Sequence, residues 1–285
     1  MLNLSKPKKG IKKNMVYDQH MHSEFSGDSK ADPEVMIKKA KELNLPGITF
    51  TDHLDWDYFK EPGLFDLDYS AYIRKVHELQ KEHNSKTFKI NLGIELGLQE
   101  HLLVRHKHFF QMVDFDFVIG SIHVVNHVDP YFDDYYKDRD VLRSYVDYFD
   151  AVLKNIETFS DFDSLGHLDY IKRYVMRHFG PEVGAINESE HKEAIDAILQ
   201  FLVKNDKALE VNTGAFRHGL TEPNPSYSII NRYKELGGKL ITIGADAHTP
   251  EYVGDHFEDV CDHLRELGFA EYAVYVNRKP VMHIL

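Results

Sequence analysis

Short apolar segments alternate with longer amphipathic segments along most of the chain. The apolar segments are typical of buried strands, and the amphipathic ones place apolar residues on one helical face. We expect strands over residues 16–20, 46–51, 87–96, 115–122, 208–212, 239–245 and 272–276. We expect helices over residues 34–43, 68–83, 101–112, 139–159, 188–205, 225–236 and 255–267. Asp32-Pro33 is a helix start signal, and Gly237-Gly238 is a helix stop.

This alternation predicts seven or eight β-α units in one α/β barrel. No linker-like stretch, fixed-period repeat or low-complexity segment interrupts it. We therefore expect a basic, flexible tail over residues 1–15 and a single TIM-like barrel over residues 16–285. In such barrels the active site forms where the strands end, and the residues with metal-binding chemistry fall at or just after those ends.

Composition narrows the class of protein. The chain has 285 residues, 42% of them hydrophobic, and a net charge of −12, which disfavours binding to nucleic acid. The one cysteine, Cys261, suits a reducing compartment and a buried position in a helix. No apolar run is long enough to span a membrane, and no apolar segment follows the N-terminal lysines as in a signal peptide. We expect a cytoplasmic protein; its oligomeric state stays open.

Histidines and acids recur at the predicted strand ends. His20 and His22 alternate on the first strand and should face the same way, as should Asp246 and His248. Each histidine alone could be an ordinary strand or cap residue, but the pairs favour metal binding. Burial of a lone carboxylate on an apolar strand would be costly without a cation, which makes Glu95 a candidate bridge between metals. The remaining candidates are His53, His123 and His167.

Six motifs in order resemble the PHP (polymerase and histidinol phosphatase) family. They are Asp18-Gln-His20-Met-His22, Thr51-Asp52-His53, Gly93-Ile-Glu95, Gly120-Ser-Ile-His123, Gly166-His167-Leu-Asp169 and Asp246-Ala-His248. The match covers roughly residues 16–250. Within the family, the chain is most similar to the histidinol-phosphate phosphatases of histidine biosynthesis. The resemblance implies a distorted (β/α)7 barrel with a trinuclear metal site.

The resemblance also implies which residues hold each metal. The first ion would be bound by His20, His22, Glu95 and Asp246, and the second by Glu95, His123 and His167. The third would be bound by Asp28, His53 and His248, although Asp28 could instead be a solvated loop residue. Imidazoles with carboxylates suit zinc, manganese or iron better than calcium or magnesium.

Three further acids, Asp18, Asp52 and Asp169, are candidates to accept hydrogen bonds from ligand imidazoles, with turn or cap roles as the alternative. Glu95, Asp246 and His248 are the candidate catalytic positions. We expect a metal-bound hydroxide to attack phosphorus, since metals lower the pKa of water and neutralise phosphoryl charge.

A small phosphate monoester also needs cationic groups outside the metal site. Arg217 and Arg173 follow predicted strand ends, and a guanidinium matches phosphate oxygens in pairs. For the two arginines the alternative is a surface position where they pair with barrel acids. His218 and His127 are weaker candidates for contact with substrate. Asp133 or Asp134 could pair with a substrate amine, or belong to a packed loop. The histidine-rich segment His101, His106 and His108 is expected to be a solvated helix face.

The function expected from these features is hydrolysis of L-histidinol phosphate to L-histidinol and phosphate by a phosphoric monoester hydrolase. Another small phosphate ester, or phosphotyrosine protein, is the nearest alternative. A barrel that has lost catalysis and serves as a scaffold is a more distant alternative, and so is a metal-dependent amidohydrolase. Arg217 and the trinuclear set favour phosphate over amide substrates.

Overall fold

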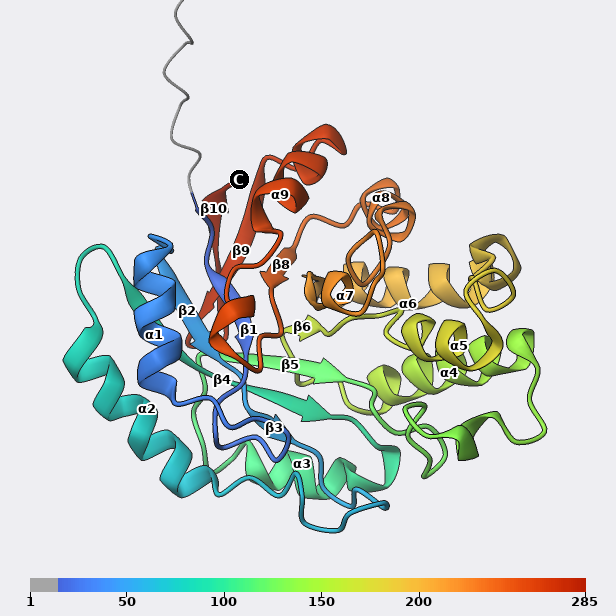
Figure 1. Ribbon diagram of the computed structural model, residues 1–285, viewed down its shortest axis with the longest axis horizontal. Coiled ribbons are helices and arrows are strands. Elements are labelled where there is room, and N and C mark those ends of the chain that lie inside the picture. The colour runs from blue at the N-terminus through green and yellow to red at the C-terminus, as the bar shows by residue number, and fades with distance from the viewer. Residues whose placement is uncertain (1–14) are drawn as a thin grey trace, which may run out of the picture.

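The computed structural model describes residues 15–285 and forms a distorted parallel barrel (Figure 1). In the described residues the sheet runs through seven strands in chain order, each parallel to the next. They are β1 (Asp18–Met21), β2 (Gly47–Phe50), β4 (Lys89–Gly97), β5 (Phe117–Ser121), β6 (Ser164–Leu165), β7 (Ala208–Asn212) and β8 (Ile241–Gly244). The two-residue strand β3 (His53–Leu54) pairs with the far end of β4, beyond β2. This architecture confirms the expected seven-stranded α/β barrel.

The first and last barrel strands meet just beyond their regular ends. Met21 pairs with Ala247, whose carbonyl accepts a hydrogen bond of 2.9 Å from the His22 amide. The Asp246 amide donates to the His20 carbonyl at 2.7 Å. These bonds bring the two motif segments, although 226 positions apart in the chain, to one end of the barrel.

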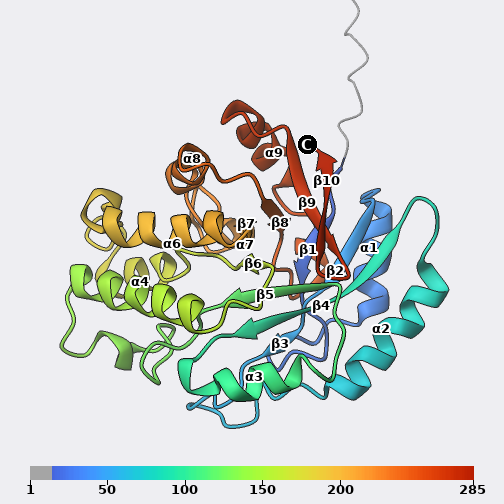
Figure 2. The ribbon, with the colours of Figure 1, turned by 180° about the vertical axis from the view of Figure 1, so that it is seen from behind.

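Helices surround the strands on the outside, as the view from behind shows (Figure 2). They are α1 (Pro33–Glu42), α2 (Tyr69–His83), α3 (Leu103–Phe109), α4 (Val141–Thr158), α5 (Lys172–Phe179), α6 (Lys192–Lys204), α7 (Gly214–Arg217), α8 (Tyr227–Glu235) and α9 (Phe257–Glu266). Short 3-10 turns are η1 (Glu100–Leu102), η2 (Asp133–Tyr136), η3 (Glu188–His191) and η4 (Pro250–Tyr252). Asp32 caps α1 by accepting from the Glu34 amide, with Pro33 in the first turn, as the sequence predicts.

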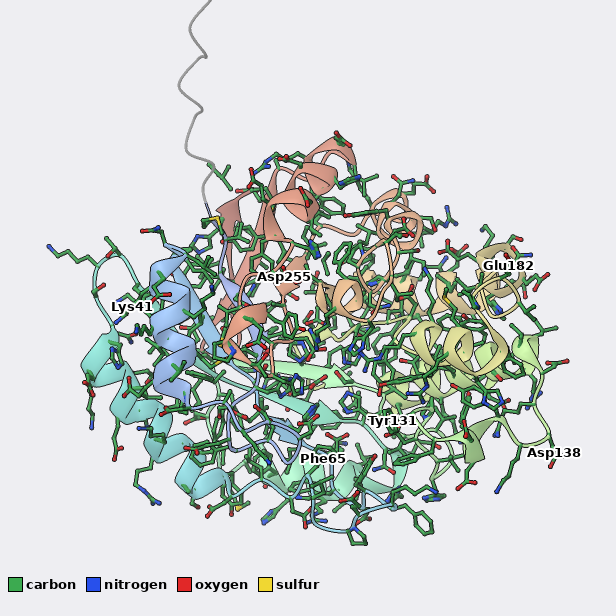
Figure 3. All side chains as sticks on the ribbon, viewed as in Figure 1. Lys41, Phe65, Tyr131, Asp138, Glu182 and Asp255 are labelled. Atoms are coloured by element: carbon green, nitrogen blue, oxygen red, sulfur yellow. The ribbon has the colours of Figure 1, made fainter. Side chains whose placement is uncertain are left out.

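Apart from Lys89 at the start of β4, the residues of the barrel strands are buried, so their side chains fill the barrel or pack under the helices. Figure 3 shows the side chains on the ribbon, with those of Lys41, Phe65, Tyr131, Asp138, Glu182 and Asp255 labelled. Tyr72 of α2 shows how helices are fixed to the sheet. Its ring is fully buried, and its hydroxyl contacts the carbonyls of Phe50 and Gly93 at 2.9 and 2.8 Å. Cys261 is buried in α9, as expected. Within residues 15–285 no helix combines the length and apolarity needed to cross a bilayer.

The last predicted strand is not a barrel strand. β9 (Glu271–Val276) pairs in antiparallel fashion with β10 (Lys279–Ile284), a strand that the sequence pattern did not reveal. Asn277 and Arg278 join them with positive φ angles of 49° and 63°, the geometry of a tight hairpin turn. Tyr275 of β9 stacks on Phe117 at the start of β5, so the hairpin covers the end of the barrel opposite the motif residues.

Two further expectations concern the ends of predicted segments. The basic tail lies outside the described residues except for Met15, which packs against the core. The histidine-rich segment is not a solvated face throughout, because His106 has 0% exposure and stacks on Trp56. His106 shares its helical face with Leu102 and Phe109, which are also buried and carry it into the core.

Candidate metal centre

Glu95 lies at the centre of the motif residues, at the end of β4. One carboxylate oxygen, Oε2, lies 3.2 Å from His20 Nε2 and 3.5 Å from His22 Nε2. The other, Oε1, lies 2.9 Å from His167 Nε2 and 3.2 Å from His123 Nε2. The two oxygens therefore face two separate pairs of imidazoles, which is the arrangement a bridging carboxylate requires.

Asp246 joins the first of these groups. Its Oδ1 lies 3.3 Å from His22 Nε2 and 3.8 Å from His20 Nε2. Its position does not come from strand alternation with His248, as the sequence suggested. β8 ends at Gly244, and Asp246 has a φ of 53°. This left-handed turn places Asp246 beside His20 and His22, and His248 Nδ1 lies 3.5 Å from Asp246 Oδ1, so both side chains still face the site.

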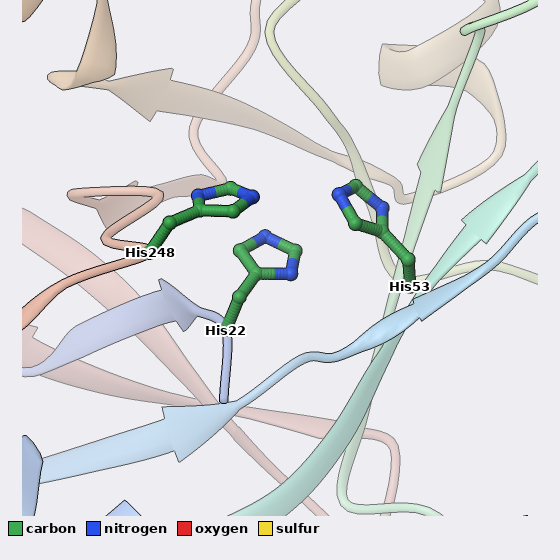
Figure 4. A group of neighbouring side chains, drawn as sticks. All are labelled: His22, His53 and His248. Carbon is green, nitrogen blue, oxygen red and sulfur yellow. The ribbon is translucent and has the colours of Figure 1, made fainter. Parts of the chain in front are cut away.

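A third group forms beside the first two. His248 Nε2 and His53 Nε2 lie 3.1 and 3.7 Å from the same oxygen of Asp28. The His22 ring stacks between them, 4.0 Å from the His248 centroid and 4.2 Å from that of His53 (Figure 4). Asp28 keeps 41% of its side chain exposed, yet it points into the cluster. The structure thus brings together all nine candidate ligands.

The donor atoms fit divalent metal ions. The Nε2 atoms of His20 and His22 lie 3.1 Å apart, and those of His123 and His167 lie 3.4 Å apart. Glu95 Oε2 is buried without a hydrogen-bond partner, although His53 Nδ1 is only 3.0 Å away. Imidazole nitrogens and carboxylate oxygens, the donor types that bind zinc, manganese or iron, therefore converge at short distances from one another, as the ligands of a cation do.

The electrostatics of the cluster also favour cations. Burial opposes ionisation of Glu95, but His20, His53 and His123 lower its pKa well below the usual range. Burial likewise opposes ionisation of Asp246, and His20 and Arg217 lower its pKa. Both carboxylates are therefore anionic at neutral pH and available as ligands.

A carboxylate that sequence reasoning missed supports His20. Glu210, in the middle of β7, lies 2.5 Å from His20 Nδ1 through its Oε1. Its Oε2 accepts a hydrogen bond of 2.7 Å from the His167 amide. Because an ionised carboxylate only accepts, the proton in this contact belongs to His20 Nδ1, and Nε2 is the nitrogen that faces the site. The detectable signal was a carboxylate in an apolar strand, the same signal that identified Glu95.

His123 is supported in the same way by Asp55, a second residue that the sequence did not reveal. Asp55 Oδ1 lies 2.8 Å from His123 Nδ1, and the neighbouring imidazole lowers the Asp55 pKa to about 2 against the effect of burial. Gly97 makes room for this carboxylate, since a Cβ at Gly97 would lie 1.9 Å from Asp55 Oδ1. The Asp55 carboxylate can therefore occupy this position only because residue 97 is a glycine, which has no Cβ.

The three acids predicted to contact ligand imidazoles differ in role. Asp52 acts through a serine, since Ser26 Oγ donates to Asp52 at 2.8 Å and lies 3.0 Å from His22 Nδ1. Asp18 contacts backbone amides instead, those of His20, Ala245 and Gly254.

Asp169 also lacks the predicted contact with a ligand imidazole. It accepts from Asn224 and from the Ser226 amide, which ties its loop to the start of α8. For Asp18 and Asp169 the structure therefore shows the alternative, a turn role, because backbone amides and the Asn224 side chain occupy their oxygens.

A cavity of about 490 Å³ opens over the cluster. Arg173, Arg217 and His218 line it, as expected of residues that meet substrate. The Arg217 guanidinium donates to the carbonyls of Ala245 and Asp246 at 2.8 and 2.7 Å, and so also holds the turn that carries Asp246. Arg173 lies over the rings of two neighbouring tyrosines, at 4.4 and 4.6 Å. Its Nε has no hydrogen-bond partner.

Three weaker candidates do not line this cavity. The exposed His127 ring lies 5.5 Å from His101. Asp133 is 88% exposed and pairs with His178, and Asp134 pairs with Lys60 and Lys137. The structure therefore gives no support to contact of His127 with substrate, which stays a prediction, and for Asp133 and Asp134 it favours the alternative, an ordinary loop role. The loop does reach the cavity, through Asp129, Tyr131 and Phe132.

Comparison with known proteins identifies the family. The PHP domain model matches residues 18–214. The chain belongs to the PHP family. The probable histidinol-phosphatase of Clostridium acetobutylicum is 34% identical over 246 residues, covering 86% of this chain and 91% of that protein. The histidinol-phosphatase of Lactococcus lactis is 34% identical over 265 residues, covering 92% of this chain and 95% of that protein.

Two solved structures share the fold. The histidinol phosphate phosphatase of Lactococcus lactis, crystallised with zinc, L-histidinol and phosphate, superposes with a TM-score of 0.82 at 29% identity. The match covers 94% of this chain and 99% of that one. A putative histidinol phosphatase from Listeria monocytogenes gives a TM-score of 0.73 at 21% identity, which supports the fold alone.

Proposed function

We propose that this PHP protein is a metal-dependent phosphomonoesterase that hydrolyses L-histidinol phosphate to L-histidinol and phosphate. The observation that carries the proposal is the Glu95 carboxylate, whose two oxygens face two imidazole pairs on the floor of a cavity that contains two arginines. The similarity to the Lactococcus lactis enzyme, which binds zinc, L-histidinol and phosphate, supports the choice of substrate.

The ligand sets proposed for three ions follow the three groups of side chains. His20, His22, Glu95 and Asp246 would hold the first ion, Glu95, His123 and His167 the second, and Asp28, His53 and His248 the third. Zinc, manganese and iron suit these donors. When bound, such ions supply Lewis acidity, which generates a nucleophile from water at neutral pH and neutralises phosphoryl charge.

The protein's own residues prepare the site for a phosphate ester. Glu210 and Asp55 fix the tautomers of His20 and His123, so that Nε2 of each imidazole is free to bind. Arg173 lines the cavity and its buried Nε has no hydrogen-bond partner, and a guanidinium binds phosphate oxygens with charge-assisted hydrogen bonds. Arg217 adds positive charge beside Asp246. Together they orient the ester for attack at phosphorus.

The proposal is tested by assay of the metal-loaded protein with L-histidinol phosphate in ¹⁸O-labelled water. We expect release of L-histidinol and one labelled oxygen in the phosphate. Label in histidinol instead would contradict attack at phosphorus. A panel with aryl phosphates and a phosphotyrosine peptide tests the substrate, and equal kcat/KM across the panel would exclude histidinol phosphate as the preferred ester. A metal-replete protein inactive on every ester would favour a scaffold.

Cytoplasmic location and lack of nucleic-acid binding stay predictions, and the net charge of −12 supports the second of them.

A further inference from the structure

The loop that follows β5 brings a buried carboxylate to the wall of the cavity. Asp129 has an exposed fraction of 8% and lines the cavity together with His123 of the proposed metal site. His127, two residues earlier, faces away from the cavity and is exposed. Asp129 is therefore the acidic group that this loop offers to a bound molecule.

Asp129 is held in place but is not neutralised. Tyr58 donates its hydroxyl to Oδ2 at 2.8 Å, and the Tyr131 amide donates to Oδ1 at 2.7 Å. Within residues 15–285 it forms no ion pair with a lysine, arginine or histidine. Burial raises its pKa even though these hydrogen bonds and His123 lower it. A carboxylate offers about four acceptor positions, so sites remain for a further donor.

The surroundings make Asp129 suited to a cation. Tyr58, Phe65, Tyr170 and Tyr174 also line the cavity and limit the water around it. Attraction between opposite charges is stronger in such a low-dielectric wall than in bulk water. The Arg173 guanidinium already covers the faces of Tyr170 and Tyr174, so a second cation in this cavity would be attracted mainly by the carboxylate.

The other carboxylates of the cavity either contact imidazoles or lie at the rim of the cavity. Glu95, Asp246 and Asp28 face the imidazoles of the proposed metal site, and Asp55 faces His123. Glu61 is exposed at the rim. Among the cavity acids that the structure describes, only Asp129 is both buried and free of an imidazole partner.

We propose that Asp129 determines specificity by binding the substrate's ammonium group, and so selects phosphate esters of amino alcohols over uncharged esters. This inference rests on the proposed phosphatase function and adds to it the residue that recognises the leaving alcohol. The arginines would bind the phosphate while Asp129 binds the amine, so a substrate with both charges would be held at two points.

The test compares two esters on the metal-loaded protein: L-histidinol phosphate and its deamino analogue, 3-(imidazol-4-yl)propyl phosphate. Asp129→Asn keeps the shape and one acceptor but removes the charge. We expect it to lower kcat/KM for histidinol phosphate about 10- to 100-fold, mainly through KM, and to change kcat/KM for the analogue by less than about twofold, because one charge-assisted hydrogen bond is lost. Asp133→Asn, an exposed acid four residues along, is the matched control and should leave both values unchanged.

Equal losses on both esters, or no loss on either, would overturn the inference. A larger loss of amine preference in Glu61→Gln would overturn it in favour of the rim carboxylate. If the wild-type protein hydrolyses neither ester, the proposed function fails, and calorimetry with L-histidinol still decides the inference. We expect weaker binding of L-histidinol to Asp129→Asn than to wild type; equal affinities, or no binding to wild type, would contradict it.

Discussion

Glu210→Gln tests whether the carboxylate behind His20 sets the metal affinity of the site. In the structure Glu210 Oε1 accepts from His20 Nδ1 at 2.5 Å, and its Oε2 accepts from the His167 amide at 2.7 Å and from Asn212 Nδ2 at 3.2 Å. Glutamine has one oxygen and one NH2 group. If its oxygen accepts from His20, its NH2 faces the His167 amide, and donor opposes donor. If it flips, its NH2 faces His20 Nδ1 and disfavours the tautomer that leaves Nε2 free.

The magnitude follows from this conflict. Hydrogen bonds to charged groups contribute about 1.5–3 kcal/mol, which corresponds to roughly a 10- to 100-fold change in an equilibrium constant. Substitution of residues that orient metal-binding imidazoles costs a similar factor in metal affinity, about 10- to 100-fold. We therefore expect Glu210→Gln to weaken zinc binding by one to two orders of magnitude, and kcat at saturating zinc to fall less.

The assay is competition between the protein and a fluorescent zinc chelator at neutral pH, with bound metal counted by mass spectrometry. Glu193→Gln, on the exposed side of α6, is the matched control. Circular dichroism and urea unfolding of both variants separate loss of affinity from loss of fold. A folded Glu210→Gln protein that holds zinc as tightly as wild type would refute the reasoning, and with it the tautomer argument for His20.

Three further predictions concern other parts of the structure. Gly97→Ala should displace Asp55, because the new Cβ would lie 1.9 Å from the Asp55 Oδ1 atom. We therefore expect zinc affinity to fall about 10- to 100-fold. Unchanged affinity in the chelator assay would argue against this contact. Burial lowers the pKa of His106 from 6.5 to about 4 in the folded protein. As pH falls, the unfolded chain therefore protonates this imidazole before the folded protein does, and folding stability is lost below about pH 6.5. Urea unfolding should show wild type losing roughly 2 kcal/mol more than His106→Leu between pH 7 and pH 5; equal losses would rule out the buried imidazole as the cause. Arg217→Ala should lower kcat/KM on histidinol phosphate by at least about 100-fold with a smaller effect on unfolding, and an unchanged kcat/KM would remove Arg217 from the site.

The sequence predicted the barrel and the cluster of candidate metal ligands because both depend on strand ends. Glu95, His123 and His167 lie at or just after the ends of apolar strands. In a parallel barrel the carboxyl ends of the strands lie at the same end of the barrel, so these residues come together there. Asp28 could not be assigned in this way, since it lies in a loop whose path depends on contacts with His53 and His248.

What the sequence missed depends on long-range contacts or on signals that were not used. Glu210 repeats the pattern of a carboxylate in an apolar strand and could have been found by it. Asp55 owes its position to the close approach of Gly97, which no local pattern encodes. β10 follows a hairpin turn, Asn277-Arg278, that lacks the usual glycine, so the strand was not expected.

The central claim is that imidazoles and carboxylates from distant strands bind metal ions around Glu95. Anomalous X-ray diffraction from crystals of the zinc-loaded protein tests it most directly. We predict a peak on each side of the carboxylate, one about 2.0–2.2 Å from Oε2 and near His20 and His22, the other at a similar distance from Oε1 and near His123 and His167. A zinc-replete crystal with no peak within bonding distance of Glu95 would contradict the account.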